Sequence, residues 1–147
     1  MKGKIEFIIS SYYFQKQFSI LVIITLIAIL FGSCQQKNPY NHGRILYENF
    51  CANCHMEDGT GLKEVIPPLA NADYLINYTD NLPCLIRKGF KGEMIVNGIS
   101  YNTEMPGVPQ LTEFEITNVI NYINTAWGND NPITKHAAVR QALSKCE

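Results

Sequence analysis

Hydrophobic residues form one long run near the start of the chain. Residues 18–31 are almost continuously apolar, and several lysines precede them. The run is shorter than the roughly 20 residues that a membrane-spanning helix needs, and its length is typical of the core of a signal peptide. The small residues Gly32 and Ser33 then lead to Cys34. We therefore expect residues 1–33 to be a signal peptide, either cleaved or retained as an anchor helix.

Beyond this leader the pattern changes to short amphipathic segments. Residues 34–42 are polar and predict a tether, and residues 43–147 predict one small domain with a C-terminal helical extension. Helices are expected from residue 43 or 44 into the region of Cys51, over residues 71–78, 82–89 and 133–145, and over a longer segment that begins at Thr112. The fold class predicted from this pattern is all-α.

The sequence predicts where the helix at Thr112 begins, and it predicts the buried face of this helix and of the first helix. Thr112 is followed three residues later by Glu115, which is the pattern of a capping box. Phe114 in this helix and Phe50 in the first helix continue apolar series at helical spacing. Both phenylalanines are therefore expected on buried faces.

Glycine and proline mark the connections between the helices. Pro67 and Pro68 lack amide donors and predict an extended segment. Several glycines and a proline interrupt residues 92–107, which predict a loop with a short hairpin at Asn97-Gly98.

The charge balance argues against one class of function. The 147 residues include 12 Lys and Arg against 13 Asp and Glu, for a formal net charge of −1. A nucleic-acid-binding domain would need a basic patch, and the sequence contains none. No nucleic-acid partner is expected.

The most specific chemical signal is the segment that runs from Cys51 to Cys54 and His55. Two cysteines separated by two residues and followed at once by histidine form the attachment site of a c-type haem. Each thiol adds to one vinyl group of the porphyrin, and the histidine then binds the iron. A zinc site would need a second Cys/His pair at similar spacing, and a thioredoxin-like pair would need a βαβ context. We therefore expect one covalent haem c, which would also enlarge the core of a small domain.

The remaining cysteines leave two alternatives open. Of the five cysteines, Cys84 and Cys146 belong neither to the haem motif nor to the end of the leader. In an oxidising compartment such a pair can form a disulfide. Sequence spacing does not fix the distance between them, so two free thiols are the other interpretation.

Residues on both sides of the haem motif resemble those of class I cytochromes c, over about residues 43–128. Gly43 and Tyr47 lie eight and four residues before Cys51, and Val119 and Tyr122 form a pair three apart in the last long helix. In that family these positions meet where the first and last helices cross, because glycine lets the backbones approach. The resemblance implies a cytochrome c fold wrapped around the haem.

The resemblance also implies the second iron ligand. Met105 is followed by Pro106 in a segment that looks like the methionine loop of the family. A thioether ligand raises the reduction potential and fills the sixth position of the iron. Met94 is an alternative in the same loop, His42 or His136 would give bis-histidine ligation, and Met56 lies too close to His55 to reach the opposite face.

Other residues are expected around the haem by the same resemblance. A carbonyl of the proline segment, from Pro67 or Pro68, would accept the second imidazole N–H of His55 and orient the ring. Plain stiffening of the loop is the alternative for these prolines. Tyr101, Asn102 and Trp127 are candidates for contacts with the haem edge or its propionates, or else core and rim residues.

The end of the leader resembles the lipobox of bacterial lipoproteins, in which the cysteine after the cleavage site carries a lipid. Cys34 would then tether the domain to a membrane on the periplasmic side of the cell envelope. Phe31 departs from the leucine usual at that position.

The resemblance implies a one-electron carrier of a periplasmic respiratory chain and not an enzyme. Its partners would be a quinol-oxidising complex as donor and a terminal oxidase as acceptor. Alternatives are a cytochrome c subunit of a periplasmic dehydrogenase, a haem enzyme or gas sensor with an open sixth site, and an assembly protein with a vestigial haem.

Overall fold

The structure is a computed structural model that describes residues 15–18, 21 and 40–146. The chain divides into two compact units, Met1–Lys37 and Asn38–Glu147. The described residues of the first unit are helical and exposed. Most of the predicted signal peptide, together with Cys34, lies outside the described residues. Within the described ranges, no helix has the length and hydrophobicity that crossing a membrane requires.

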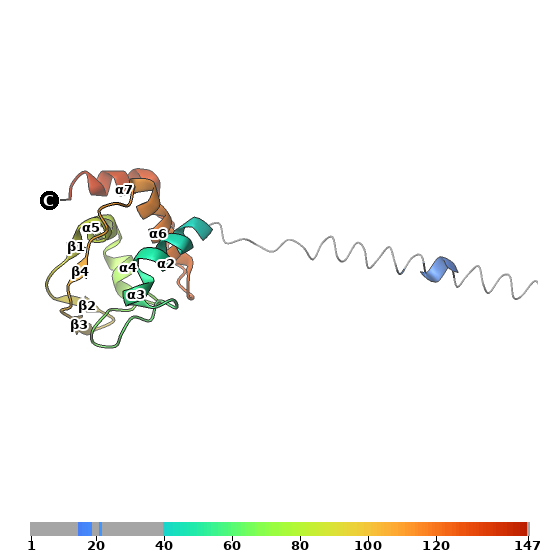
Figure 1. The fold of residues 1–147 in the computed structure, drawn as a ribbon, viewed down its shortest axis with the longest axis horizontal. Helices are drawn as coiled ribbons and strands as arrows, with labels where there is room; N and C mark the ends of the chain where they lie inside the picture. The colour runs from blue at the N-terminus through green and yellow to red at the C-terminus, as the bar shows by residue number, and fades with distance from the viewer. Residues whose placement is uncertain (1–14, 19–20, 22–39, 147) are drawn as a thin grey trace, which may run out of the picture. The chain divides into compact units, whose positions relative to one another are not determined.

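The second unit is built mainly from short helices (Figure 1). These are α2 (Asn41–Phe50), α3 (Ala52–His55), α4 (Asp73–Asn77), the 3-10 helix η1 (Thr79–Asn81), α5 (Leu82–Lys88), α6 (Glu113–Thr125) and α7 (His136–Leu143). Two small antiparallel ladders accompany them: β1 (Gly89–Phe90) with β4 (Met105–Pro106), and β2 (Met94–Val96) with β3 (Ile99–Tyr101). The prediction of an all-α domain is therefore only roughly right, because the methionine loop pairs as strands.

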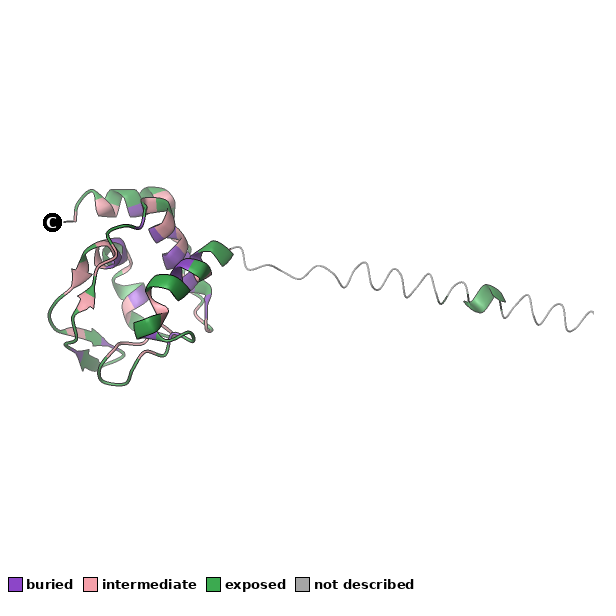
Figure 2. Cartoon of the chain, in the orientation of Figure 1, coloured by how far each residue is buried: buried purple, intermediate pink, exposed green. Residues whose placement is uncertain are grey.

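The crossing of α2 and α6 forms the centre of the packed core. A Cβ on Gly43 would lie 2.1 Å from the carbonyl oxygen of Asn118 and 2.9 Å from Cβ of Tyr122, so the two backbones touch at this glycine. The rings of Tyr47 and Tyr122 lie 5.5 Å apart, and Trp127 packs 4.9 Å from Tyr47. Figure 2 shows buried residues along α6, whereas α2 is largely exposed and buries only the side that carries Gly43, Leu46 and Tyr47. The crossing expected from the sequence is present.

Helix α6 begins as the sequence predicts. The Thr112 hydroxyl accepts the amide N–H of Glu115, and the Glu115 carboxylate accepts the amide N–H of Thr112, which completes a capping box. The prediction for its first apolar residue was wrong: Phe114 is 60% exposed, and its ring lies edge-on to the ring of His136. Phe50 at the end of α2 is likewise 41% exposed. Both residues lie at helix ends, where periodicity no longer determines what covers a face.

The hairpin predicted at Asn97-Gly98 joins β2 to β3. Both turn residues have positive φ, 51° for Asn97 and 76° for Gly98, as a two-residue hairpin turn requires. Asn97 and Asp73 also exchange hydrogen bonds, each side-chain oxygen accepting the other residue's amide N–H, at 2.8 and 3.0 Å. This exchange fixes the hairpin to the start of α4.

The C-terminal helix is shorter than predicted, covering His136–Leu143 in place of residues 133–145. The segment before it is held on α6 by Asn121, whose side chain donates to the Thr134 carbonyl and accepts the Thr134 amide. Val139 is the fully buried residue of α7, whereas Ala137 and Ala138 are exposed. Helix α2 begins at Asn41, two residues before the predicted start.

Candidate haem site

The haem motif follows α2 and forms α3. Cys51 caps the first helix, its amide donating to the Tyr47 carbonyl, and His55 ends the second. The Tyr47 hydroxyl donates to the carbonyl of Met56 at 2.6 Å. Tyr47 is fully buried, and burial raises its pKa above the usual range, with a smaller effect of nearby Cys51. A protonated phenol therefore holds the chain just after the histidine.

The two thiols of the motif are free and differ in exposure. Cys51 is half-buried and Cys54 is exposed. Burial raises the pKa of Cys51 to about 11, and the neighbouring Cys54 adds to the shift. Neither takes part in the disulfide of the domain, which joins Cys84 to Cys146. Both motif thiols are thus available for thioether bonds.

His55 is oriented by the proline segment. Its Nδ1 donates to the carbonyl oxygen of Pro67 at 3.0 Å. Burial lowers the pKa of His55, an effect that the Pro67 hydrogen bond partly opposes. A neutral ring protonated at Nδ1 presents the Nε2 lone pair, which is the form that binds a metal. Pro67 therefore has the orienting position expected for one of the two prolines.

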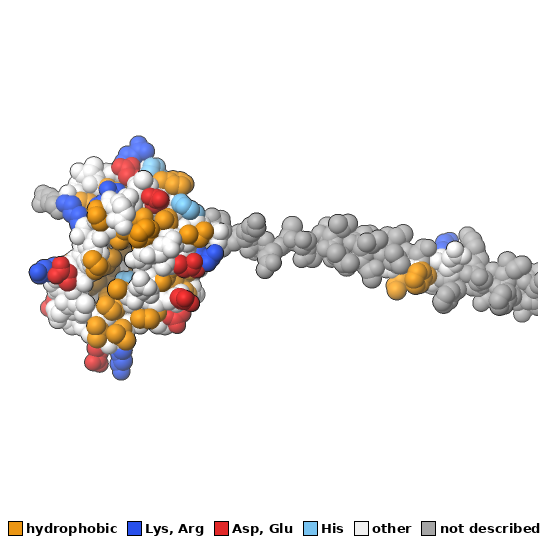
Figure 3. Space-filling model, in the orientation of Figure 1, with side chains coloured by type: hydrophobic (Ala, Val, Ile, Leu, Met, Phe, Trp, Pro, Cys, Tyr) orange, Lys and Arg blue, Asp and Glu red, His pale blue; other side chains and the backbone are white. Residues whose placement is uncertain are grey.

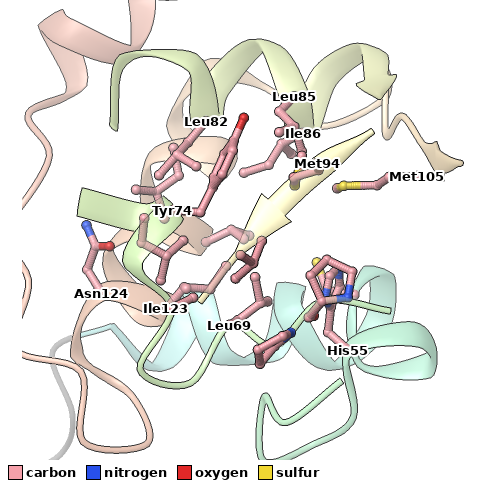
Figure 4. Close-up of a pocket in the computed structure, with 18 residues that line it drawn as sticks. His55, Leu69, Tyr74, Leu82, Leu85, Ile86, Met94, Met105, Ile123 and Asn124 are labelled. Atoms are coloured by element: carbon pink, nitrogen blue, oxygen red, sulfur yellow. The ribbon is translucent and has the colours of Figure 1, made fainter. Parts of the chain in front are cut away.

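An apolar cavity opens beside His55. Its lining is almost entirely apolar, as is usual for cofactor sites. Figure 4 shows His55 and Met105 at one end of the cavity and Asn124 at the other. Its walls come from the proline segment and helices α4, α5 and α6, and include Pro68, Leu69, Leu75, Leu82, Ile86, Val119, Ile120 and Ile123. Figure 3 shows the corresponding prevalence of hydrophobic side chains on one face of the domain.

A second hollow adjoins the first and brings in the methionine loop. Its lining includes Cys54 and Tyr101. His55, Pro67, Met94 and Met105 line both spaces. The two hollows therefore meet between the motif histidine and the two methionines of the loop.

The iron-ligand candidates separate into two groups. Met105 and Met94 both reach the cavity, so both stay available as partners of His55. His136 lies on α7, where its ring nitrogens contact Thr117 and Arg140. His42 is exposed at the start of α2 and Met56 is 37% exposed, and neither lines the two hollows.

Of the other expected haem neighbours, some line the cavity region and some do not. Tyr101 is buried and lines the second hollow, whereas Asn102 is exposed and lines neither. Trp127 also lies outside both linings, packs against Tyr47 and donates its indole N–H to the carbonyl of Glu57 at 3.0 Å. Trp127 thus takes the core position that the sequence left open as its alternative.

Gly61 has a positioning role that sequence reasoning missed. It has a φ of +64°, and a Cβ there would lie 2.6 Å from the Pro67 carbonyl oxygen and 2.4 Å from that of Ile66. Its amide also donates to the His55 carbonyl at 3.0 Å. Only a residue without a side chain lets the Pro67 carbonyl come this close to the haem motif. The signal in the sequence is the Gly59-Thr60-Gly61 run, a pair of glycines that by itself indicates only a break between helices.

The donor set fits a covalently attached haem. Two free thiols and a histidine with an available Nε2 stand at the mouth of an apolar space, and a thioether sulfur faces the same space. At the far end, Oδ1 of Asn124 is buried and has no hydrogen-bond partner among residues 40–146. A buried acceptor without a partner is expected where a bound group completes the site.

Comparison with known proteins agrees with this fit. The family Cytochrome c matches residues 40–127. Cytochrome c-552 of Thermus thermophilus is 37% identical over 83 residues, which cover 54% of this chain and 63% of that protein. The cytochrome c subunit of alcohol dehydrogenase (quinone) from Gluconobacter oxydans is 35% identical over 106 residues, 70% of this chain and 22% of that protein. This chain therefore spans less than two thirds of the length of either relative.

The match begins within the turn before α2 and ends at Trp127, so it includes the haem motif, the proline segment, the methionine loop and α6. Those are the segments that surround the cavity. The chain belongs to the cytochrome c family, in which the cofactor is a covalently bound haem c.

Proposed function

We propose that this protein is a one-electron carrier of a periplasmic respiratory chain, held at a membrane by its N-terminal segment. The observation that carries the proposal is the placement of His55 and Met105 on one apolar cavity next to the thiols of the motif. A histidine and a thioether together fill both axial positions of an iron. A site closed in this way suits electron transfer better than binding of a substrate.

The residues of the chain have separable tasks in this function. Haem c supplies the redox chemistry by cycling between ferric and ferrous iron. His55, oriented by Pro67, would hold one axial position, and Met105 would hold the other. The apolar side chains of α5 and α6 keep water away, so that little solvent reorganises when the charge of the site changes.

Substitution of the two methionines of the loop tests the ligand assignment. Met105→Ala should keep the covalent haem, lose the low-spin spectrum, lower the reduction potential and open the ferrous iron to carbon monoxide. Met94→Ala is the matched control because Met94 lines the same space. It should keep the thioether–iron absorption of the ferric protein. The reverse pattern would assign the iron to Met94, and an unchanged spectrum in both variants would remove methionine ligation altogether.

The membrane tether and the envelope location belong to the proposal as well. Cys34 follows an apolar run and two small residues, which favours lipid attachment after cleavage. A lipid anchor would raise the concentration of the carrier near membrane-bound redox partners. Cys34→Ala should move the protein from the membrane fraction to the soluble periplasm, while Ser33→Ala should leave it in the membrane fraction. Retention of the Cys34→Ala protein in the membrane would indicate an uncleaved anchor.

A second candidate is service as the cytochrome c subunit of a periplasmic dehydrogenase. The match to the Gluconobacter dehydrogenase subunit extends over 70% of this chain and favours this alternative. Purification of the membrane complexes that retain the protein distinguishes the two. A quinol-oxidising complex or a terminal oxidase in the same fraction supports the respiratory carrier, and a dehydrogenase flavin or quinone subunit supports the alternative.

A further inference from the structure

The segment after Trp127 folds back over the domain and is fastened to α5. A disulfide joins Cys84 in α5 to Cys146, with the Cα atoms 5.5 Å apart. Nζ of Lys88, at the end of the same helix, donates to the carbonyl of Cys146 at 2.9 Å. Cys146 lies beyond residues 40–127, which match the family, whereas Cys84 and Lys88 lie within them, so the clamp ties the C-terminal segment to the matched domain.

Helix α5 also forms a wall of the haem cavity. Leu82, Leu85 and Ile86 line it. The residue after the helix starts β1, which pairs with β4 so that Phe90 stands opposite Met105. The Ile86 carbonyl accepts the amide of Val108 at 2.8 Å, just beyond the methionine. The segment that carries Met105 is therefore bonded to α5 three residues after the methionine, and at the methionine itself it pairs with the strand that follows α5.

This contact is backbone against backbone. A Cβ on Gly89 would lie 2.3 Å from the Met105 carbonyl oxygen, and one on Gly107 would lie 2.4 Å from the Lys88 carbonyl carbon. No side chain separates the end of α5 from the methionine loop, so neither can move without displacing the other. A displacement of α5 is thus passed directly to Met105.

We propose that the Cys84–Cys146 disulfide is a positioning device for the axial thioether: by clamping α5 it keeps Met105 on the haem iron. This inference rests on the proposed function, in which Met105 fills the sixth position. The disulfide spans a sequence separation of 62 residues, and Met105 lies inside the loop that it closes. Closure restricts the open conformations of that loop more than the closed one, which lowers the population without the sulfur–iron bond.

Binding of imidazole to the ferric holoprotein measures that population, because imidazole can occupy the iron only when Met105 has left it. The apparent affinity for imidazole equals the intrinsic affinity multiplied by the fraction of molecules in which Met105 has left the iron. In a Cys84→Ala/Cys146→Ala variant the open fraction should rise, and imidazole should bind about tenfold more tightly than to the wild type, equivalent to about 1.4 kcal/mol. The reduction potential should fall in the same variant as thioether ligation weakens.

Asn121→Ala is the matched control. It removes the two hydrogen bonds that fasten residue 134 to α6 and leaves both cysteines in place. Its imidazole affinity should equal that of the wild type. An equal increase in this variant would overturn the proposal, since general loosening of the extension would then be the cause. Unchanged affinity in the double variant would overturn it as well.

A second measurement tests the same proposal on the wild-type protein, in case the double variant does not fold. Cys84 and Cys146 line an open hollow and are both half-buried, so a phosphine can reduce their bond in the folded wild type, with oxidation of the phosphine to its oxide. The two thiols are then capped with a maleimide and the haem is reoxidised. Tighter imidazole binding by this protein supports the clamp, and unchanged binding refutes it. If wild type lacks the thioether–iron absorption, the proposed function fails, and this inference fails with it.

Discussion

Replacement of Gly43 by alanine tests the helix crossing on which the haem motif is mounted. The new Cβ would lie 2.1 Å from the carbonyl oxygen of Asn118, whereas ordinary contact begins at 3.4 Å. The atom in the way belongs to the backbone of α6 and cannot rotate aside. The crossing must therefore widen by about 1.3 Å, the difference between these two distances.

The expected cost follows from two opposing effects. Overpacking of a tight interface costs about 1–3 kcal/mol, and a backbone obstacle places Gly43 near the upper end. Alanine in a helix is about 1 kcal/mol more favourable than glycine. The net loss of unfolding free energy is about 2 kcal/mol, or roughly 8–16 °C in Tm for a domain of this size. Widening would also disturb the ring contacts of Tyr47 with Tyr122.

Guanidinium unfolding of the holoprotein measures this loss. Asn49→Ala is the control, because Asn49 is exposed on α2 and gains helix propensity without entering the crossing. It should be neutral or slightly stabilising. A Gly43→Ala protein as stable as the wild type, with the same denaturant slope, would show that the backbones of α2 and α6 do not touch at this residue.

Two further substitutions have defined outcomes. Tyr47→Phe removes the hydroxyl that donates to the Met56 carbonyl, which keeps the Gly59 amide as a donor, so the unfolding free energy should fall by about 0.5–1.5 kcal/mol in denaturant titrations. Because the folded pKa of Tyr47 is raised, its contribution is complete below the usual tyrosine pKa and is lost as pH rises above it. The variant should therefore lose less stability than wild type above about pH 10, and equal alkaline slopes would contradict the assignment. Thr112→Ala should cost about 1 kcal/mol by removing the capping box, and Thr112→Ser should restore it, as measured by thermal unfolding.

Features that depend on neighbouring residues were predictable from the sequence. The capping box needs only Thr112 and Glu115 on one turn, and the hairpin needs only two residues that accept positive φ. The haem motif is local in the same sense, because Cys51, Cys54 and His55 lie within one helical turn. In each case the physical requirement is met by residues close together in the sequence, so the sequence alone is enough to predict the feature.

Features that depend on which segments meet were harder to predict. The helical period places Phe114 on the apolar side of α6, but what covers a helix end is set by the path of the chain after residue 128. Trp127 could have faced the haem or the core, and the carbonyl that accepts its indole N–H belongs to Glu57, 70 residues away. The choice between Met94 and Met105 is of the same kind, because both side chains enter one cavity.

The role of the disulfide depends on a long-range contact that the local sequence around each cysteine does not predict. Cys84 and Cys146 could be paired by elimination, but elimination gave neither the distance nor the consequence. The structure adds that Cys84 lies on the helix whose far end contacts the methionine loop through Gly89 and Gly107. Gly89, predicted as the end of a helix, and Gly107, predicted as part of a loop, are therefore the contact through which the proposed clamp at the C-terminus would act on Met105. In this chain the haem-attachment residues can be recognised from their motif, whereas the residues that hold Met105 in place emerge only from the packing of α5.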